Sequence, residues 1–155
     1  MDPSSITKSS RTTGPRRAPL GTRIWAAAAA AGSLAVLVAA ALITPSPEGY
    51  NTHTQLGLAP CAWAALSGKP CPTCGMTTAF AHAANLDLLA SIQTQPFGAF
   101  LAVVTATSFW LCLHTALTGS RVLELVGGLF RWWVWAAFIA GFVASWVYKM
   151  MAWEG

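Results

Sequence analysis

The sequence predicts an all-helical integral membrane protein with three transmembrane helices and a short helix that does not cross the bilayer. Of the 155 residues, 55% are hydrophobic and only 9% are charged, whereas soluble proteins carry about 25% charged residues. The apolar residues gather in three stretches, each about as long as the roughly 20 residues that a helix needs to cross the hydrocarbon core. Composition and patterning together place the chain in a lipid bilayer.

The three apolar stretches are the predicted spans. They cover residues 24–43, 96–117 and 126–150, and the second contains Cys112, a small side chain that suits apolar packing. Five of the eight tryptophans fall near the predicted ends of these spans, namely Trp25, Trp132, Trp133, Trp146 and Trp153. The amphipathic indole ring favours the headgroup layer, so we interpret these tryptophans as membrane anchors.

The basic residues indicate a membrane topology and not a nucleic-acid partner. Seven of the nine precede the first span or flank the connection between the second and third, and cytoplasmic segments carry such an excess. We therefore expect a bacterial plasma (inner) membrane protein with a cytoplasmic N-terminus, an exoplasmic cysteine-containing loop and an exoplasmic C-terminus. Residues 1–22 are predicted as a disordered basic cytoplasmic tail, and residues 23–153 as a single membrane domain. The seven are Lys8, Arg11, Arg16, Arg17, Arg23, Arg121 and Arg131, against Lys69 and Lys149 on the other side.

A short helix is predicted over residues 72–84, within the loop between the first two spans. Pro72 suits the first helical position, and Cys71 occupies the predicted N-terminal cap. We expect Asn85 to end this helix in a left-handed conformation and Asp87 to cap a second short turn. At about 20 Å the helix is shorter than the roughly 30 Å hydrocarbon core, so it must be re-entrant or interfacial.

The run Cys-Pro-Thr-Cys-Gly-Met-Thr-Thr-Ala-Phe at residues 71–80 is the most distinctive motif of the chain. With Cys61-Ala-Trp before it and Gln-Pro-Phe-Gly at residues 95–98 after it, this motif resembles a domain-of-unknown-function family of small bacterial multi-pass membrane proteins. The family core is Cys-Pro-x-Cys-Gly-x-Thr-Arg, and the resemblance covers about residues 56–105. It implies membrane residence and a shared structural core, but no activity. The further motif positions are Pro72, Gly75 and Thr77, and Thr78 stands where many members carry arginine.

Thiol–disulfide exchange is one interpretation of the motif. A cysteine that caps a helix feels the partial positive charge of the unsatisfied amides, which lowers its pKa and raises its thiolate fraction. Cys71 would then be the attacking sulfur. Cys74, three residues further on, would be the resolving sulfur.

Metal binding is the second interpretation, because Cys-Pro-x-Cys-Gly is also similar to one knuckle of a zinc ribbon. A structural zinc ion takes four ligands, usually from two such pairs, and the sequence contains one pair, Cys71 and Cys74. Cys61 and His53 are the further candidate ligands. Alternatively, two chains each donate one knuckle across a homodimer.

The third interpretation is structural, with a Cys71–Cys74 or Cys61–Cys71 disulfide that fixes the loop against the membrane. The sequence contains no Ser/His/Asp set, no paired carboxylates and no phosphate-binding loop, which favours a role other than catalysis. The leading hypothesis is a structural or interaction component of the membrane, with a redox partner protein and a zinc-binding protein as alternatives. Its expected partners are the lipid bilayer and a second copy or another membrane protein, and no cofactor other than zinc is expected.

Overall fold

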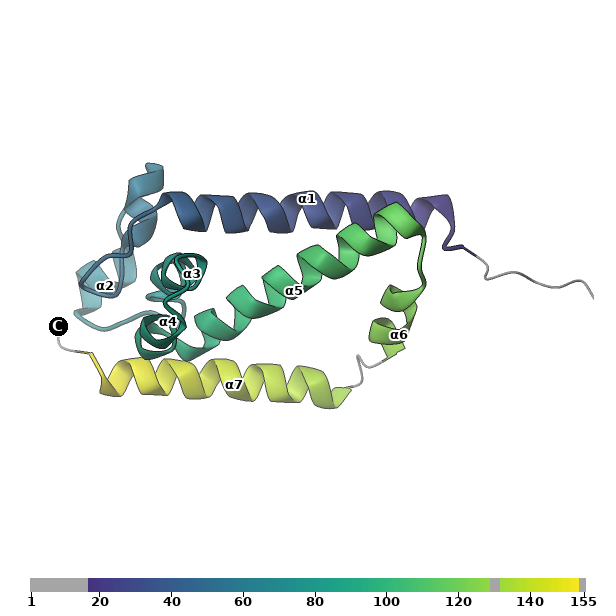
Figure 1. Ribbon diagram of the computed structural model, residues 1–155. Helices are drawn as coiled ribbons and strands as arrows, with labels where there is room; N and C mark the ends of the chain where they lie inside the picture. The colour runs from purple at the N-terminus through teal and green to yellow at the C-terminus, as the bar shows by residue number, and fades with distance from the viewer. Residues whose placement is uncertain (1–16, 129–131, 154–155) are drawn as a thin grey trace, which may run out of the picture.

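All the regular elements of the computed structural model are helices over the residues that it describes, 17–128 and 132–153 (Figure 1). Three of them are long and apolar enough to cross a membrane, which confirms the predicted fold class. They alternate in direction, so the segment 43–95 and the end of the last helix lie together (Figure 1). We call this the loop end, and the opposite end the α6 end. The long helices are α1 (Leu20–Leu42), α5 (Pro96–Thr118) and α7 (Trp132–Met151), and α6 is Val122–Gly128.

The first and third spans differ in their bounds from the sequence prediction. Helix α1 begins at Leu20, four residues before the predicted span, and the side chain of Arg23 in its first turn donates hydrogen bonds to the carbonyl oxygens of Ala116 (3.1 Å) and Leu117 (3.4 Å). A cation is favourable at this place, the C-terminal end of α5. Residues 1–16 of the predicted tail lie outside the described part of the chain.

The predicted third span, 126–150, is divided between two helices. Residues 126–128 belong to α6, residues 129–131 lie outside the described part of the chain, and α7 begins at Trp132. Helix α7 has 20 residues, which still suffices to cross a bilayer.

Small side chains join α1 to α5 at the α6 end. Ala26 and Ala30 of α1 are buried against Cys112 of α5, which confirms the packing role predicted for this cysteine. Small residues allow two membrane helices to approach closely. Towards the loop end α1 and α5 diverge, and two short helices lie in the space between the long ones (Figure 1). These are α3 (Met76–Ala84) and α4 (Leu88–Thr94).

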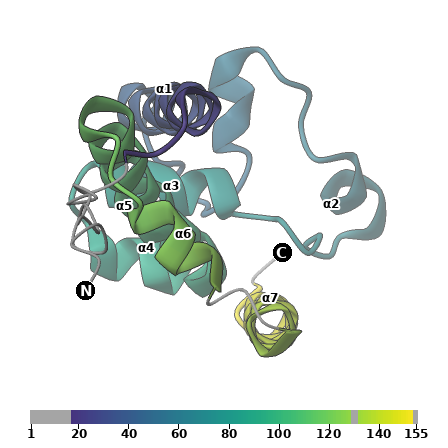
Figure 2. The ribbon, with the colours of Figure 1, turned by 90° about the vertical axis from the view of Figure 1, so that its right-hand side faces the viewer.

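Helices α3 and α4 run crosswise to the long helices (Figure 2). With nine residues, α3 is only about 13 Å long, so it cannot cross the bilayer. The two short helices are joined by a buried hydrogen bond from the Ser91 hydroxyl to the Ala79 carbonyl oxygen, 2.7 Å long. Asp87 caps α4 as predicted, since its carboxylate accepts a hydrogen bond from the Ala90 amide (3.0 Å).

The motif helix begins later than the sequence predicted. Helix α3 starts at Met76 and not at Pro72, because Gly75 in front of it has a left-handed backbone (φ +86°) that interrupts the helix. Cys71 is therefore not a helix cap. At the other end, α3 stops at Ala84 as expected, but Leu86 takes the left-handed conformation (φ +64°) that was predicted for Asn85.

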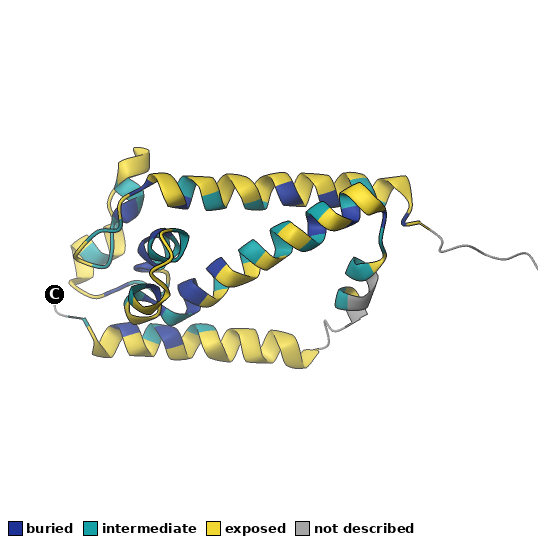
Figure 3. Cartoon of the chain, in the orientation of Figure 1, coloured by how far each residue is buried: buried dark blue, intermediate teal, exposed yellow. Residues whose placement is uncertain are grey.

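Helix α7 contacts the rest of the molecule mainly through its C-terminal half, and most of its surface is exposed (Figure 3). Apolar contact comes from Phe97 of α5, whose ring packs on Phe138 with the ring centres 4.8 Å apart. Polar side chains near its C-terminus bond to backbone groups of the loop end. These side chains are Ser145, Trp146, Tyr148, Lys149 and Trp153.

Candidate metal centre: a three-cysteine cluster

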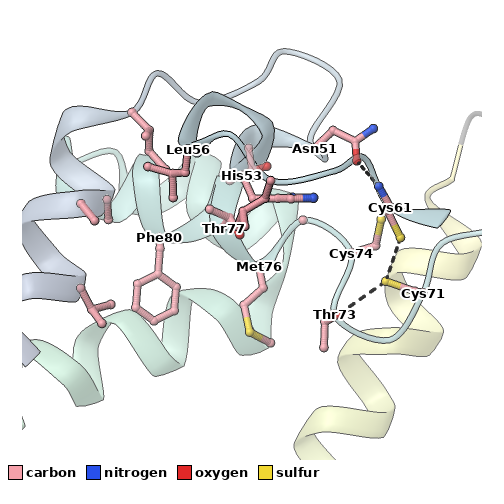
Figure 4. Close-up of a pocket in the computed structure, with 17 residues that line it drawn as sticks. Asn51, His53, Leu56, Cys61, Cys71, Thr73, Cys74, Met76, Thr77 and Phe80 are labelled. Atoms are coloured by element: carbon pink, nitrogen blue, oxygen red, sulfur yellow. Dashed lines mark hydrogen bonds between the residues drawn. The ribbon is translucent and has the colours of Figure 1, made fainter. Parts of the chain in front are cut away.

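Three cysteines of the loop end converge on one point. The sulfurs of Cys61, Cys71 and Cys74 all lie within 4.8 Å of one another, and the Cys61 and Cys71 sulfurs are 3.6 Å apart (Figure 4). Cys74 is buried, and the other two are partly exposed. The motif pair predicted from the sequence is thus joined by Cys61, ten residues before it.

Asn51 positions Cys61. It precedes the short 3-10 helix η2 (Thr52–Leu56) with a left-handed backbone (φ 60°), and its side-chain oxygen accepts a hydrogen bond from the Cys61 amide (3.1 Å). Cys61 itself stands at the N-terminal end of the short helix α2 (Ala62–Ser67). This bond closes the loop between Asn51 and Cys61 and so places Cys61 next to the motif.

A tight turn holds the other two sulfurs. The Cys74 amide donates to the Cys71 carbonyl oxygen (3.0 Å), and the Met76 amide donates to that of Thr73 (3.1 Å). Gly75 completes the turn, and a β-carbon at this position would lie 2.7 Å from the Gly49 carbonyl oxygen. The glycine of the motif is therefore required both by its backbone conformation and by this close approach.

Two tryptophans of the last span and C-terminus hold the segment that enters the motif. The Trp146 indole donates to the carbonyl oxygen of the buried Pro70 (3.3 Å), and the Trp153 indole donates to that of Gly68 (3.0 Å). The membrane-anchor interpretation of these two tryptophans is thus incomplete, because their N–H groups also fix the residues just before Cys71.

The two motif cysteines differ in acidity. Partial burial by itself would raise the pKa of Cys71, but hydrogen bonds to its sulfur from Thr73 and Cys61 outweigh the burial, and the pKa lies below its usual value. The Thr73 hydroxyl is 3.5 Å from that sulfur. Burial, followed by repulsion from Cys71, raises the pKa of Cys74 to about 11. The sequence predicted an acidic Cys71 for a different reason, a helix N-terminus, and that reason is wrong.

The cluster opens into a cavity of about 600 Å³ between α1, η2 and α3. Figure 4 shows the sulfurs at one end of this cavity and Leu56 and Phe80 at the other. Val36 and Ile43 of α1 add to its apolar wall. The sulfurs are therefore accessible from one side and enclosed by protein on the other.

The remaining predicted site residues lie nearby but do not join the cluster. His53 and Thr77 line the same cavity. The group of candidate ligand atoms that lie within 4.8 Å of one another contains the three cysteine sulfurs and no nitrogen of His53. The His53 Nε2 atom bonds to the Ala59 carbonyl oxygen, 3.0 Å away. Thr78 is fully buried and shares a 2.8 Å hydrogen bond with the hydroxyl of Thr52.

The geometry of the three sulfurs suits a thiophilic metal ion. Tetrahedral zinc sites have Zn–S distances of about 2.3 Å, which separates neighbouring sulfurs by about 3.8 Å. The spacing of 3.6 Å for the closest pair, with all three sulfurs within 4.8 Å, is near that value. Small side-chain rotations would place the three thiolates around one ion.

Fold and site together define an all-helical protein, over the residues described, with three helices long and apolar enough to cross a membrane and a three-cysteine cluster at one end of them. Residues 61–110 match a family model described as "Protein of unknown function (DUF2752)", which confirms the resemblance to a domain of unknown function. The matched segment is about a third of the chain and contains all three clustered cysteines. No curated protein and no solved structure matches the chain.

Proposed function

We propose that the cluster of Cys61, Cys71 and Cys74 binds one thiophilic metal ion, with Zn²⁺ as the preferred ion, and that the bound ion stabilises the loop end. The observation that carries this proposal is the convergence of three sulfurs within 4.8 Å from two separate segments. Thiolates select zinc and copper(I) over hard ions such as Mg²⁺ and Ca²⁺. The protein would then be a structural or interaction component of the membrane that needs a metal ion for the shape of its loop end.

A bound ion would join two segments whose Cys61 and Cys71 sulfurs lie 3.6 Å apart. Cys61 belongs to the start of α2, whereas Cys71 and Cys74 belong to the turn before α3. Three protein ligands leave the fourth position of a tetrahedral ion free for water or for a donor atom in the cavity. A homodimer in which a second copy supplies the fourth ligand remains part of this proposal.

Zinc content tests the proposal. Detergent-purified wild type should retain one Zn²⁺ per chain, and Cys74→Ser should weaken zinc binding at least about 100-fold, because each thiolate contributes several of the about 10–16 kcal/mol that structural zinc sites gain. Cys112→Ser is the matched control, since this cysteine packs in the α1–α5 interface. Wild type without zinc affinity, or equal affinity in both variants, would refute the proposal.

Thiol–disulfide exchange is the second candidate function, favoured by the close Cys61–Cys71 pair and the acidity difference between Cys71 and Cys74. The Cys71 thiolate would attack a disulfide of a partner protein and form a mixed disulfide. Attack by Cys61 on the Cys71 sulfur would then leave a Cys61–Cys71 disulfide and release the partner as a dithiol. This exchange requires the exoplasmic orientation that the distribution of basic residues predicts.

Alkylation of intact, reduced and metal-depleted cells with a membrane-impermeant maleimide tests this candidate. Near neutral pH, Cys71 should react faster than a free cysteine and Cys74 more slowly, since the thiolate is the reactive form and the pKa is lowered for Cys71 and raised for Cys74. Mass spectrometry of the labelled peptides gives both profiles. Identical profiles would contradict the acidity difference, and labelling only after lysis would contradict the orientation.

A further inference from the structure

Lys149 is a buried cation near the three-cysteine cluster. It lies in the last turn of α7 with only 9% of its surface exposed, and its ammonium donates hydrogen bonds to the carbonyl oxygens of Gly49 and Thr94, each 3.3 Å away. The Trp153 ring centre is 5.9 Å from the same nitrogen. Among the residues that the structure describes, no carboxylate pairs with this ammonium.

A buried ammonium without an anionic partner is costly, because the loss of hydration is not offset by an opposite charge. Backbone carbonyl groups and an aromatic ring supply only partial negative charge. Two of the three N–H groups of Lys149 are engaged by the two carbonyl oxygens. Within the described part of the chain, a negative charge close to the end of α7 would therefore stabilise this ammonium.

The cluster turn lies next to this ammonium. A β-carbon on Gly75 would lie 3.4 Å from the Lys149 nitrogen, and Gly75 directly follows Cys74. This close approach places the Lys149 ammonium next to the turn that holds Cys74.

Metal binding at the cluster would supply such a negative charge. Thiols release their protons as they bind Zn²⁺, so three thiolates and one divalent ion carry one net negative charge. One ammonium beside them makes the whole site neutral. A neutral site is the arrangement that a partly buried position at a membrane tolerates best.

We propose that Lys149 compensates the negative charge of the metal-loaded cluster and so favours binding of a divalent thiophilic ion. This inference rests on the function proposed above. Lys149 would act as a positioning residue outside the ligand set, through the positive charge that it places near Cys74. The geometry also assigns a role to the only basic residue of α7 within the described part of the chain.

Zinc affinity, measured by competition with a chromophoric chelator on the full-length protein in detergent, tests the inference. Lys149→Gln keeps N–H donors but removes the charge, and it should weaken Zn²⁺ binding about 10-fold or more, as outer-shell substitutions do. The control, Lys69→Gln, also removes one positive charge, but from an exposed position of the loop end. It should stay within about twofold of wild type, since exposed charges are screened.

Arsenite separates the charge effect from a structural effect. Arsenous acid binds three thiols by exchanging its three hydroxyl groups for three sulfurs, with release of three water molecules, and the product carries no net charge. Lys149→Gln should therefore bind arsenite within about twofold of wild type, because a neutral complex has no charge for the lysine to balance. Competition with a dithiol dye gives this affinity.

The outcomes distinguish the two levels of the proposal. Weaker zinc binding with unchanged arsenite binding in Lys149→Gln supports the inference. Equal zinc affinity in Lys149→Gln and wild type, or parallel losses for zinc and arsenite, overturns the charge role and leaves the zinc function intact. Wild type that binds arsenite but not zinc overturns the zinc function, and the inference fails with it.

Discussion

The loop end and the α6 end lie at opposite ends of the same helices and are held together by different interactions. At the α6 end, α1 and α5 meet mainly through small apolar side chains, with Ala26 and Ala30 against Cys112, and Arg23 is the polar side chain that bonds to the end of α5. At the loop end, polar side chains bond to backbone groups, and a fully buried hydrogen bond joins Thr52 to Thr78. Cysteine has a different role in each region: Cys112 packs between apolar side chains at the α6 end, whereas the three cysteines of the loop end form a cluster of thiols.

This difference indicates how accurately each end is positioned. Apolar contact in a membrane tolerates small shifts, because lipid and side chains are equally apolar. A hydrogen bond to a chosen carbonyl group fixes a position, and the loop end has many such bonds around the cysteines. The loop end is therefore built for positional accuracy, and the α6 end for close helix contact.

Gly75→Ala should be the most damaging substitution in the loop end. The added β-carbon meets the Gly49 carbonyl oxygen at 2.7 Å, and the backbone is left-handed (φ +86°). Together these should lower the free energy of unfolding by about 3 kcal/mol or more, since the left-handed backbone alone costs about 1–2 kcal/mol. Thermal unfolding in detergent measures the loss.

Gly57→Ala is the matched control for that substitution. Gly57 is also left-handed (φ +78°), but nothing lies within 4 Å of its added β-carbon. It should lose only the backbone contribution of about 1–2 kcal/mol. If the two variants were equally stable, the close approach to Gly49 would not be a constraint on the cluster turn.

Ala26→Leu should damage the α6 end and spare the cluster. Ala26 is 3% exposed against α5, so the larger side chain forces the helices apart and costs about 1–3 kcal/mol. Ala28→Leu, on an exposed face of α1, should change stability by less than about 0.5 kcal/mol. Zinc affinity should be the same in both variants, and a loss confined to Ala26→Leu would show that the two ends are not independent.

Thr78→Val should have a smaller effect, at the loop end. It keeps the shape of the side chain but removes the 2.8 Å bond to Thr52, which costs about 1–2 kcal/mol for a buried pair. Thr107→Val is the control, because this threonine is on an exposed face of α5 and bonds only within its own helix. Equal unfolding temperatures for the two variants would argue against a polar core in the loop end.

The spans could be predicted because apolar length alone decides whether a helix crosses a membrane. Helix α1 extends four residues before the predicted span, and Arg23 in this extension bonds to carbonyl groups more than 90 residues away, which no local pattern contains. The start of the motif helix was wrong for a local reason. Proline favours a first helical turn, but Gly75 adopts the left-handed backbone and delays the helix to Met76.

The cluster was predictable in part. The spacing of Cys71 and Cys74 singled out the pair, and Cys61 was among the candidate ligands, whereas His53 lies in the same cavity without joining the sulfurs. From the sequence, Lys149 is predicted only to indicate membrane topology. Its position next to the cluster turn depends on how α7 packs against the loop end. The sequence shows only that Lys149 is a single basic residue within an apolar span.

X-ray absorption at the zinc edge of the zinc-loaded, full-length protein is the most direct test of the central claim that three cysteines bind one ion. The account predicts a first shell dominated by three sulfur scatterers at about 2.3 Å. It also predicts one lighter donor atom that completes the tetrahedron. A first shell of oxygen or nitrogen alone, or of a single sulfur, would contradict it.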